Sequence, residues 1–469
     1  MPVKPVKLIA FLLAVLSLGA SAACSRSPVI RQAVTSSSEP SFNETDALDM
    51  EYKIGTTDID LGDVTTIVDE SGEPYVTPSY NITDRTVSLL SHWDASTPDS
   101  IHMVNYIRKY GGPQIEFVTA PYGDCGTKLQ AMVLADNSPD IYKVRDGDTA
   151  NLMRQGMFTD LTGLINWDNR NWRDLKPYLD TVTYDGKILI APEFNSNYFV
   201  WFNRSVFDEH STEDPLSLYE KGEWTLDNFD NLCRRLTIRS NGAIQTYGFG
   251  YDHTWMRQVF SFFDAQLHVK HGDTYENTIN SDATADAVSY LNKEINVWKV
   301  TCAREKALPY FAGGKLAMLW YGNWLSMSTP FAEMNLNGAI DFVPAPENTA
   351  SGLGPRQDFA LAGHAIPVGA KNTDAAVAFI EIFNFYKQTP ELDTVSTQTQ
   401  CEINNWSYEQ FRRMRIPRYY KNKYTFIDLS DTWGYILDSV ETGQPWLSVR
   451  DIYSKQIDLA IEGIENSGK

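Results

Sequence analysis

The chain has 469 residues, 43% of them hydrophobic, and single hydrophobic cores stop growing at about 250 to 300 residues. Its 40 Lys and Arg residues against 60 Asp and Glu residues give a formal net charge of -20, which repels polyanions. We therefore expect two lobes and no nucleic-acid partner.

The first 23 residues have the pattern of a secretory signal peptide. Lys4 and Lys7 precede an apolar run from Leu8 to Leu18, and small residues follow up to Cys24. The apolar run is shorter than the about 20 residues that a membrane-spanning helix needs, and no later stretch is long and apolar enough. The pattern predicts export, with the rest of the chain held outside the membrane.

The segment from Ser21 to Cys24 resembles the bacterial lipobox, in which the cysteine is diacylated. Ser21 stands where lipoboxes usually carry Leu, so cleavage after Ala22 or Ala23 without lipidation is the alternative. Two acyl chains suffice for stable anchoring. Residues 24–44 are rich in Ser, Thr, Pro and acids without apolar periodicity, which predicts a flexible tether from the lipid.

Residues 45–85 have short apolar pieces and turn signals, so we expect an extended segment packed on the main body. After it, strand-like and helix-like patterns alternate. The strands are predicted at 86–90, 115–119 and 141–144, and the helices at 99–110 and 127–134. This alternation is typical of an α/β domain with a parallel sheet, whose ligands lie at the carboxyl ends of the strands.

The second half repeats the mixed character. We predict helices near 225–236 and 282–300, strands near 247–251 and 317–320, and several helical pieces after residue 390. Thr225 has the chemistry of a helix N-cap, Asp185 to Lys187 that of a turn, and Gly313-Gly314 that of a break between a helix and a strand.

Short segments of this sequence stand in an order shared with one known family. They are NSPDI at 137–141, GMFTDL at 156–161, YDGK at 184–187, WFNRSVF at 201–207, EWTLDNF at 223–229, FAGGKLAM at 311–318 and GNW at 322–324. From about Thr86 to its end the chain resembles the extracellular solute-binding proteins of ABC importers, in particular the maltose-binding type. It departs from the family pattern in lacking a proline before Trp224.

The resemblance implies a two-lobed α/β fold of the periplasmic-binding-protein type (type II), with the ligand in a cleft between lobes that close by a hinge. It places residues 86–191 and 345–389 in lobe 1 and residues 195–340 and 391–469 in lobe 2. The chain is expected to cross between lobes near Pro192, between Asp341 and Pro346, and near residue 390.

The function implied is noncatalytic capture of an extracellular solute and its delivery to the transmembrane subunits of an ABC permease. The resemblance implies a monomer without cofactor or metal. The lipid-anchored protein is expected on the outer face of the cytoplasmic membrane, or on the periplasmic side in a cell with two membranes.

Sugars present apolar CH faces ringed by hydroxyl groups, so their sites need aromatic rings and planar polar side chains. Residues of these types follow the predicted strands or the first crossing, and His364 lies in a loop before a strand predicted at 365–368. They are Trp93, Asp94, Tyr122, Asp124, Asp146, Ser196, Tyr198, Trp255, Asn323, Trp324 and His364. By the resemblance, Trp324 stacks on a sugar. A core position is the alternative for Trp93, a helix cap or solvated loop for Asp124 and Asp146, and a structural role for His364.

The sequence is also compatible with other functions and ligands. The sequence has no HExxH, GxSxG or Walker A motif, but its many acids leave open a carboxylate pair for glycoside hydrolysis. A polyamine, a phosphate ester or a peptide is the alternative to an oligosaccharide ligand, and a sensor is the alternative to a transport receptor. Four cysteines, at 125, 233, 302 and 401, allow three disulfide pairings or free thiols.

Overall fold

The computed structural model describes residues 74–467 except 94, 97, 146–148, 174, 196–197, 273, 358–359, 389–400, 403 and 416–428. The predicted signal peptide, Cys24, the tether at 24–44 and the first part of the 45–85 segment lie outside these residues. All described residues belong to one compact unit, residues 54–469. None of its described helices is long and apolar enough to cross a membrane.

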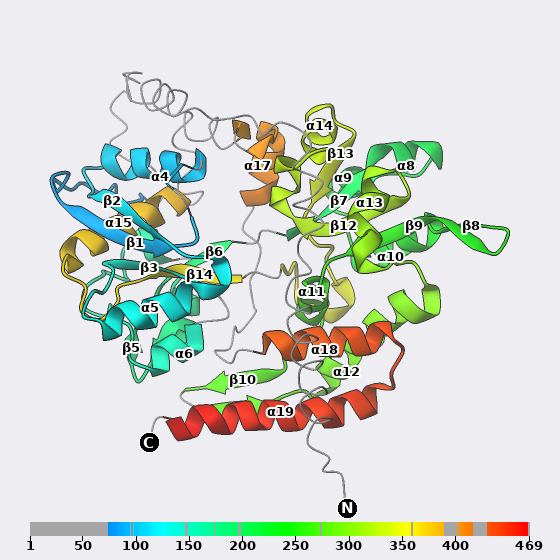
Figure 1. Ribbon diagram of the computed structural model, residues 1–469. Helices are drawn as coiled ribbons and strands as arrows, with labels where there is room; N and C mark the ends of the chain where they lie inside the picture. Colours follow the sequence, from blue (N-terminus) through cyan, green and yellow to red (C-terminus); the bar gives the residue numbers. More distant parts are fainter. Residues whose placement is uncertain are drawn as a thin grey trace, which may run out of the picture. The chain divides into compact units, whose positions relative to one another are not determined.

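The first lobe is built on a five-stranded sheet with the order β2-β1-β3-β14-β6 (Figure 1). Its strands are β1 (Thr86–Ser91), β2 (Gln114–Thr119), β3 (Ile141–Val144), β6 (Ala191–Asn195) and β14 (Ala360–Ala365). β1 runs parallel to β2 and β3, and β14 runs antiparallel to β3 and β6. The carboxyl ends of β1, β2, β3 and β6 therefore lie at one edge of the sheet.

Helices cover both faces of this sheet because successive side chains of a strand point to opposite faces. Leu89 packs in one core with side chains of α4 (Pro98–Lys109) and α15 (Thr373–Gln388), while Leu90 packs in another with α5 (Cys125–Leu134). The shorter elements of this lobe are α6 (Thr149–Arg154), α7 (Arg170–Arg173), η3 (Lys176–Val182), β4 (Thr183–Tyr184) and β5 (Lys187–Ile188).

The second lobe is built on a five-stranded sheet with the order β13-β7-β12-β9-β8. Its strands are β7 (Tyr198–Asn203), β8 (Ile238–Ser240), β9 (Ala243–Tyr251), β12 (Leu316–Gly322) and β13 (Ile340–Val343). β12 is parallel to β9 and antiparallel to β7. The carboxyl ends of β9 and β12 and the amino end of β7 therefore share one edge.

Two cores cover the faces of the second sheet, and β7 contributes Val200 and Phe202 to one and Phe199 and Trp201 to the other. The helices on the first side are α10 (Leu226–Arg235), α11 (Trp255–Phe262), α12 (Asp282–Asn292), α18 (Ser430–Glu441) and α19 (Trp446–Ser467). Those on the other side are α13 (Ala307–Ala312), α14 (Phe331–Leu336) and α17 (Tyr408–Arg415). The other α-helices and strands described in this lobe are α8 (Arg204–Glu209), α9 (Pro215–Glu220), β10 (His268–His271) and β11 (Thr274–Asn277).

The two sheet edges are joined by a very short piece of chain. β6 ends the first sheet at Asn195, β7 begins the second at Tyr198, and only residues 196 and 197 stand between. Three residue steps span at most about 10 Å. Chain connectivity alone therefore holds the carboxyl edge of the first sheet close to the edge of the second sheet at which β7 begins.

The chain returns to the first sheet later than residue 345, where the sequence predicted the start of the second part of lobe 1. Trp224 donates a hydrogen bond to the carbonyl of Pro344 (2.7 Å), and Asn348 donates one to that of Phe262 (3.0 Å). The buried Arg356 side chain forms an ion pair with the exposed carboxylate of Asp264 (2.6 Å). These bonds keep residues 344–356 on the second lobe, and the first sheet resumes only with β14 at Ala360.

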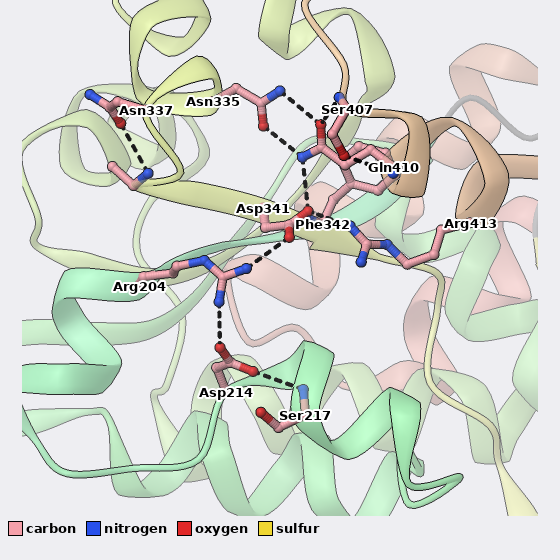
Figure 2. A network of polar contacts seen from close by, with 11 residues as sticks. Arg204, Asp214, Ser217, Asn335, Asn337, Asp341, Phe342, Ser407, Gln410 and Arg413 are labelled. Atoms are coloured by element: carbon pink, nitrogen blue, oxygen red, sulfur yellow. Dashed lines mark hydrogen bonds and ion pairs between the residues drawn. The ribbon is translucent and has the colours of Figure 1, made fainter. Parts of the chain in front are cut away.

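Asp341 of β13 joins three elements of the second lobe, as Figure 2 shows. One carboxylate oxygen accepts from Arg204 of α8 (2.8 Å); the other accepts from Arg413 (2.6 Å) and Gln410 (2.8 Å), both on α17. Arg204 also pairs with Asp214 at the start of α9 (2.8 Å). This network attaches α17 to the edge strand of the sheet.

Residues 74–85 run along the first lobe. Tyr80 and Ile82 donate backbone hydrogen bonds to the carbonyls of Tyr110 and Gly111 (3.1 and 3.0 Å), and Val76 pairs with the side chain of Asn171. These residues therefore pack on the first lobe.

Candidate ligand-binding site

Aromatic side chains meet at the shared edge of the second sheet. Trp324 follows β12, and 41% of its surface is exposed. Its ring lies 5.3 Å from the half-buried ring of Tyr198, nearly perpendicular at 80°, and Tyr198 in turn stacks on buried Trp320 (6.0 Å, 15°). We call Trp324, Tyr198 and Trp320 the platform. Its outermost ring is held in place from behind and presents apolar surface to solvent.

Gly322 leaves room for the Trp324 ring. A Cβ atom at this position would lie 2.4 Å from the indole carbons, which is closer than any real contact of this kind. The indole therefore folds back over the last residue of β12 only because that residue has no side chain. The GNW segment at 322–324 thus sets the direction of the platform.

A carboxylate stands at the end of neighbouring strand β9. One oxygen of Asp252 accepts hydrogen bonds from the backbone N–H of Thr254 (2.8 Å) and from its hydroxyl. Trp320 donates its indole N–H to that hydroxyl oxygen (2.9 Å), which directs the Thr254 proton toward Asp252. Burial raises the pKa of the Asp252 carboxyl. The platform is therefore joined to a fixed hydrogen-bond acceptor.

The first sheet also carries aromatic side chains at its carboxyl edge. Trp93 follows β1 and is half-buried, and Tyr122 follows β2 and is 59% exposed. His92 packs between them, 5.7 Å from the Trp93 ring and 4.9 Å from that of Tyr122. The guanidinium of Arg145, after β3, lies 4.5 Å from the Tyr122 ring.

Buried charged side chains pack against the aromatic residues of this edge. Lys143 lies 4.9 Å from the Trp93 ring and forms a buried ion pair with Glu193 of β6, which also pairs with Lys387 (3.2 Å). Burial opposes ionisation of Glu193, but the two lysines hold its pKa well below the usual range. Burial and then Lys143 lower the pKa of His364 and of His92, so both imidazoles are neutral at pH 7.

Comparison with known proteins gives this arrangement a family. The family model for bacterial extracellular solute-binding proteins matches residues 103–385, more than half of the chain. The chain belongs to this family. Comparison with curated protein sequences found no significant match.

Solved structures show the same fold as this solute-binding protein. The sugar-binding protein MalE of Xanthomonas citri is 13% identical, with a TM-score of 0.62, over 81% of this chain and 98% of its own. A sugar transporter protein of Rhizobium etli in an open conformation is 18% identical, with a TM-score of 0.58, over 80% and 99%. The GacH receptor of Streptomyces glaucescens is 16% identical, with a TM-score of 0.54, over 80% and 98%. At these identities the likeness establishes the two-lobed α/β fold.

The solute-binding protein brings part of the predicted set together at the two edges. Trp93 and Tyr122 lie at the carboxyl edge of the first sheet, which we call the first edge. Tyr198 and Trp324 lie at the shared edge of the second sheet, which we call the second edge. Asp124 is exposed at the start of α5, and Asn323 is half-buried with its amide 3.5 Å from the Met414 sulfur. Asp94, Asp146 and Ser196 lie outside the described residues. The described residues contain no group of His, Cys, Asp and Glu side chains placed to hold a metal.

Two of the predicted ligand contacts are core residues instead. Trp255 is 0% exposed and donates its indole N–H to buried Glu294 (3.0 Å). His364 is 2% exposed and packs against Phe379 and Phe383. It lies within β14 rather than in a loop before a strand. Neither side chain has surface for a solute, so both predictions are wrong for this conformation.

Asp252 is the residue that the sequence reasoning missed at this edge. It directly follows the strand predicted at 247–251, so the strand-end rule that selected Trp93 and Tyr122 would have found it.

Proposed function

We propose that this protein is the ligand-capturing subunit of an ABC importer and that its ligand is an oligosaccharide. The observation that carries the proposal is the platform: an exposed Trp324 ring, held by Tyr198, beside the carboxylate of Asp252. An aromatic face suits the apolar face of a sugar ring, and a carboxylate oxygen accepts from its hydroxyl groups.

The first edge supports the same ligand class. Trp93 and Tyr122 offer a second aromatic pair at strand ends, and the two-residue link between Asn195 and Tyr198 keeps the edges near each other. A ligand that touches both edges stabilises the closed state of two lobes joined by short crossings.

The cellular setting belongs to the same proposal. Residues 1–23 direct export, Cys24 carries the lipid, and residues 24–44 tether a monomeric receptor at the outer face of the membrane. The ligand passes from there to the transmembrane subunits of the permease, without chemical change. The solved relatives that share the fold include sugar-binding proteins, which supports a carbohydrate ligand.

A thermal-shift screen tests the ligand class. A ligand that binds only the folded state raises the melting midpoint by mass action. We expect a shift with linear or cyclic oligosaccharides and none with polyamines, phosphate esters or peptides. Chromatography of the incubated sugar is expected to recover it intact. A shift with polyamines or peptides alone would overturn the carbohydrate proposal, and breakdown of the sugar would favour an exported carbohydrate-active enzyme.

The substitution Gly322→Ala tests the platform without replacing any of its three aromatic residues. The added methyl group must displace the Trp324 indole, whose carbons lie 2.4 Å from the new atom. We expect the Kd for the oligosaccharide found in the screen to rise at least about 5-fold in isothermal titration, with the fold intact. The matched control is Gly434→Ala in α18, where the new atom meets nothing within 4 Å. Equal affinities in the two variants would show that the ring direction does not matter.

A further inference from the structure

Two buried carboxylates meet at one tyrosine in the second lobe. The hydroxyl of Tyr290 on α12 lies 2.5 Å from an oxygen of Asp230 on α10 and 3.3 Å from an oxygen of Glu294. Glu294 is the second residue of the π-helical turn η4 (Lys293–Trp298), which continues α12. Asp230 is 7% exposed and Glu294 is 1% exposed. The other oxygen of Glu294 accepts the indole N–H of Trp255 (3.0 Å).

Proton accounting requires a hydrogen between the two carboxylates. The Tyr290 hydroxyl has one proton, and the shorter contact shows that it is donated to Asp230. The contact with Glu294 then needs a proton on Glu294, whose O–H donates to the hydroxyl oxygen. Two charged carboxylates at this depth, with a single hydroxyl proton between them, would lack the hydrogen bonds that buried charges need.

No cation replaces this proton. Among the described residues neither carboxylate has an ion pair, and the nearest cations point elsewhere. Lys293 lies over the Trp298 ring at 4.3 Å, and Arg234 at 4.7 Å. Burial raises the pKa of Asp230 to about 6 and raises that of Glu294 well above its usual range. The pair therefore retains one proton at neutral pH.

Trp255 connects this buried group to the platform. The Trp255 ring, which Glu294 holds, packs on Trp320 (5.2 Å), and Trp320 stacks on Tyr198. Thr254, next in the chain to Trp255, accepts the Trp320 indole N–H (2.9 Å). The orientation of the Trp255 indole is thus fixed on one side by Glu294 and on the other side by the platform.

We propose that Asp230, Tyr290 and Glu294 form a one-proton clamp that positions the platform through Trp255, and that loss of this proton at alkaline pH loosens it. The platform's role in ligand binding rests on the proposed function, whereas the clamp does not. Other ionisable and charged groups face the clamp from the elements around it. They are Asp227, Cys233 and Arg234 on α10, Tyr251 of β9 with its partners Arg304 and Glu441, and Lys293.

The sign of the pH effect follows from the raised pKa values. The folded protein keeps a proton that carboxyl groups of the unfolded chain, with pKa values of about 4, release at lower pH. The stabilisation by the Glu294 proton is therefore complete below the pKa of an unfolded carboxyl group and is lost as pH rises through the folded-state pKa of Glu294, which burial holds well above its usual range. Glu294→Gln replaces the protonated acid with a neutral amide that still accepts from Trp255 and donates to Tyr290.

The clamp is tested by melting the ligand-free protein at about pH 6 and about pH 8.5. Both pH values lie below the pKa of ordinary tyrosines. We expect the wild-type melting midpoint to fall by roughly 3 °C more than that of Glu294→Gln over this range. The tryptophan bands of the near-ultraviolet circular dichroism should change with pH in the wild type and stay constant in Glu294→Gln. Glu462→Gln, an exposed acid on α19, should behave as the wild type.

Parallel melting profiles of the wild type and Glu294→Gln would overturn the clamp. A pH-dependent midpoint with unchanged tryptophan bands would overturn its link to the platform. Glu294→Leu, which removes the bond to Trp255, should show altered tryptophan bands at both pH values. If that variant does not fold, the Gln comparison still decides. No ligand is used, so a failed ligand screen does not affect this result.

Discussion

Trp324→Ala is expected to weaken oligosaccharide binding by roughly 30- to 700-fold, which corresponds to about 2–4 kcal/mol. Trp324 offers the largest exposed aromatic surface at the edge where β7, β9 and β12 meet, and Tyr198 and Tyr321 hold it from two sides. Alanine removes the stacking surface and leaves Tyr198 uncovered.

Isothermal titration with the oligosaccharide from the screen measures this loss. Trp324→Phe should keep part of the affinity because a smaller ring still stacks. The matched control is Tyr435→Ala, which removes a ring that is 53% exposed on α18 and stacked on Tyr453. A Trp324→Ala affinity within about 3-fold of the wild type would place the ligand away from the platform.

Asp341→Ala is expected to lower the free energy of unfolding by roughly 3–5 kcal/mol at pH 7. The substitution leaves the guanidinium of Arg413, with 11% of its side chain exposed, without the carboxylate it pairs with, and removes a partner from Arg204. It also removes one of the two acceptors of the Gln410 amide (Figure 2). Helix α17 should separate from β13 before the rest of the lobe unfolds.

Urea unfolding followed by circular dichroism gives this difference, and hydrogen exchange of α17 shows where it begins. The control is Asp438→Ala, whose pair with Arg304 is exposed, with 57% of the aspartate side chain accessible. Exposed pairs contribute at most about 1 kcal/mol. Equal losses in the two variants would show that burial of Asp341 is not what makes its pairs stabilising.

Much of the local structure could be predicted because its signals lie within a few residues. The predicted strand at 141–144 and helix at 225–236 agree closely with β3 (Ile141–Val144) and α10 (Leu226–Arg235). Thr225 caps α10 by accepting from the Asn228 N–H (3.3 Å). Gly314, with φ of 68°, makes the break between α13 and β12 that its sequence indicated.

Burial of the predicted site residues was harder to judge. A tryptophan after a strand indicates a ligand contact or a core position equally well, and only tertiary packing decides. For Trp255 a local signal did exist: with Val259 and Phe262 it forms an i, i+4, i+7 stripe, the mark of a core-facing helix. No such signal exists for His364, because β14 pairs with β3 across more than 200 residues of sequence.

A crystal structure of the protein with the oligosaccharide from the screen would be the most direct test. We expect a sugar ring against Trp324, a hydroxyl group donating to Asp252, and contacts from Trp93 or Tyr122 of the other edge to the same ligand. A sugar bound elsewhere, with the Trp324 ring free, would contradict the proposed site.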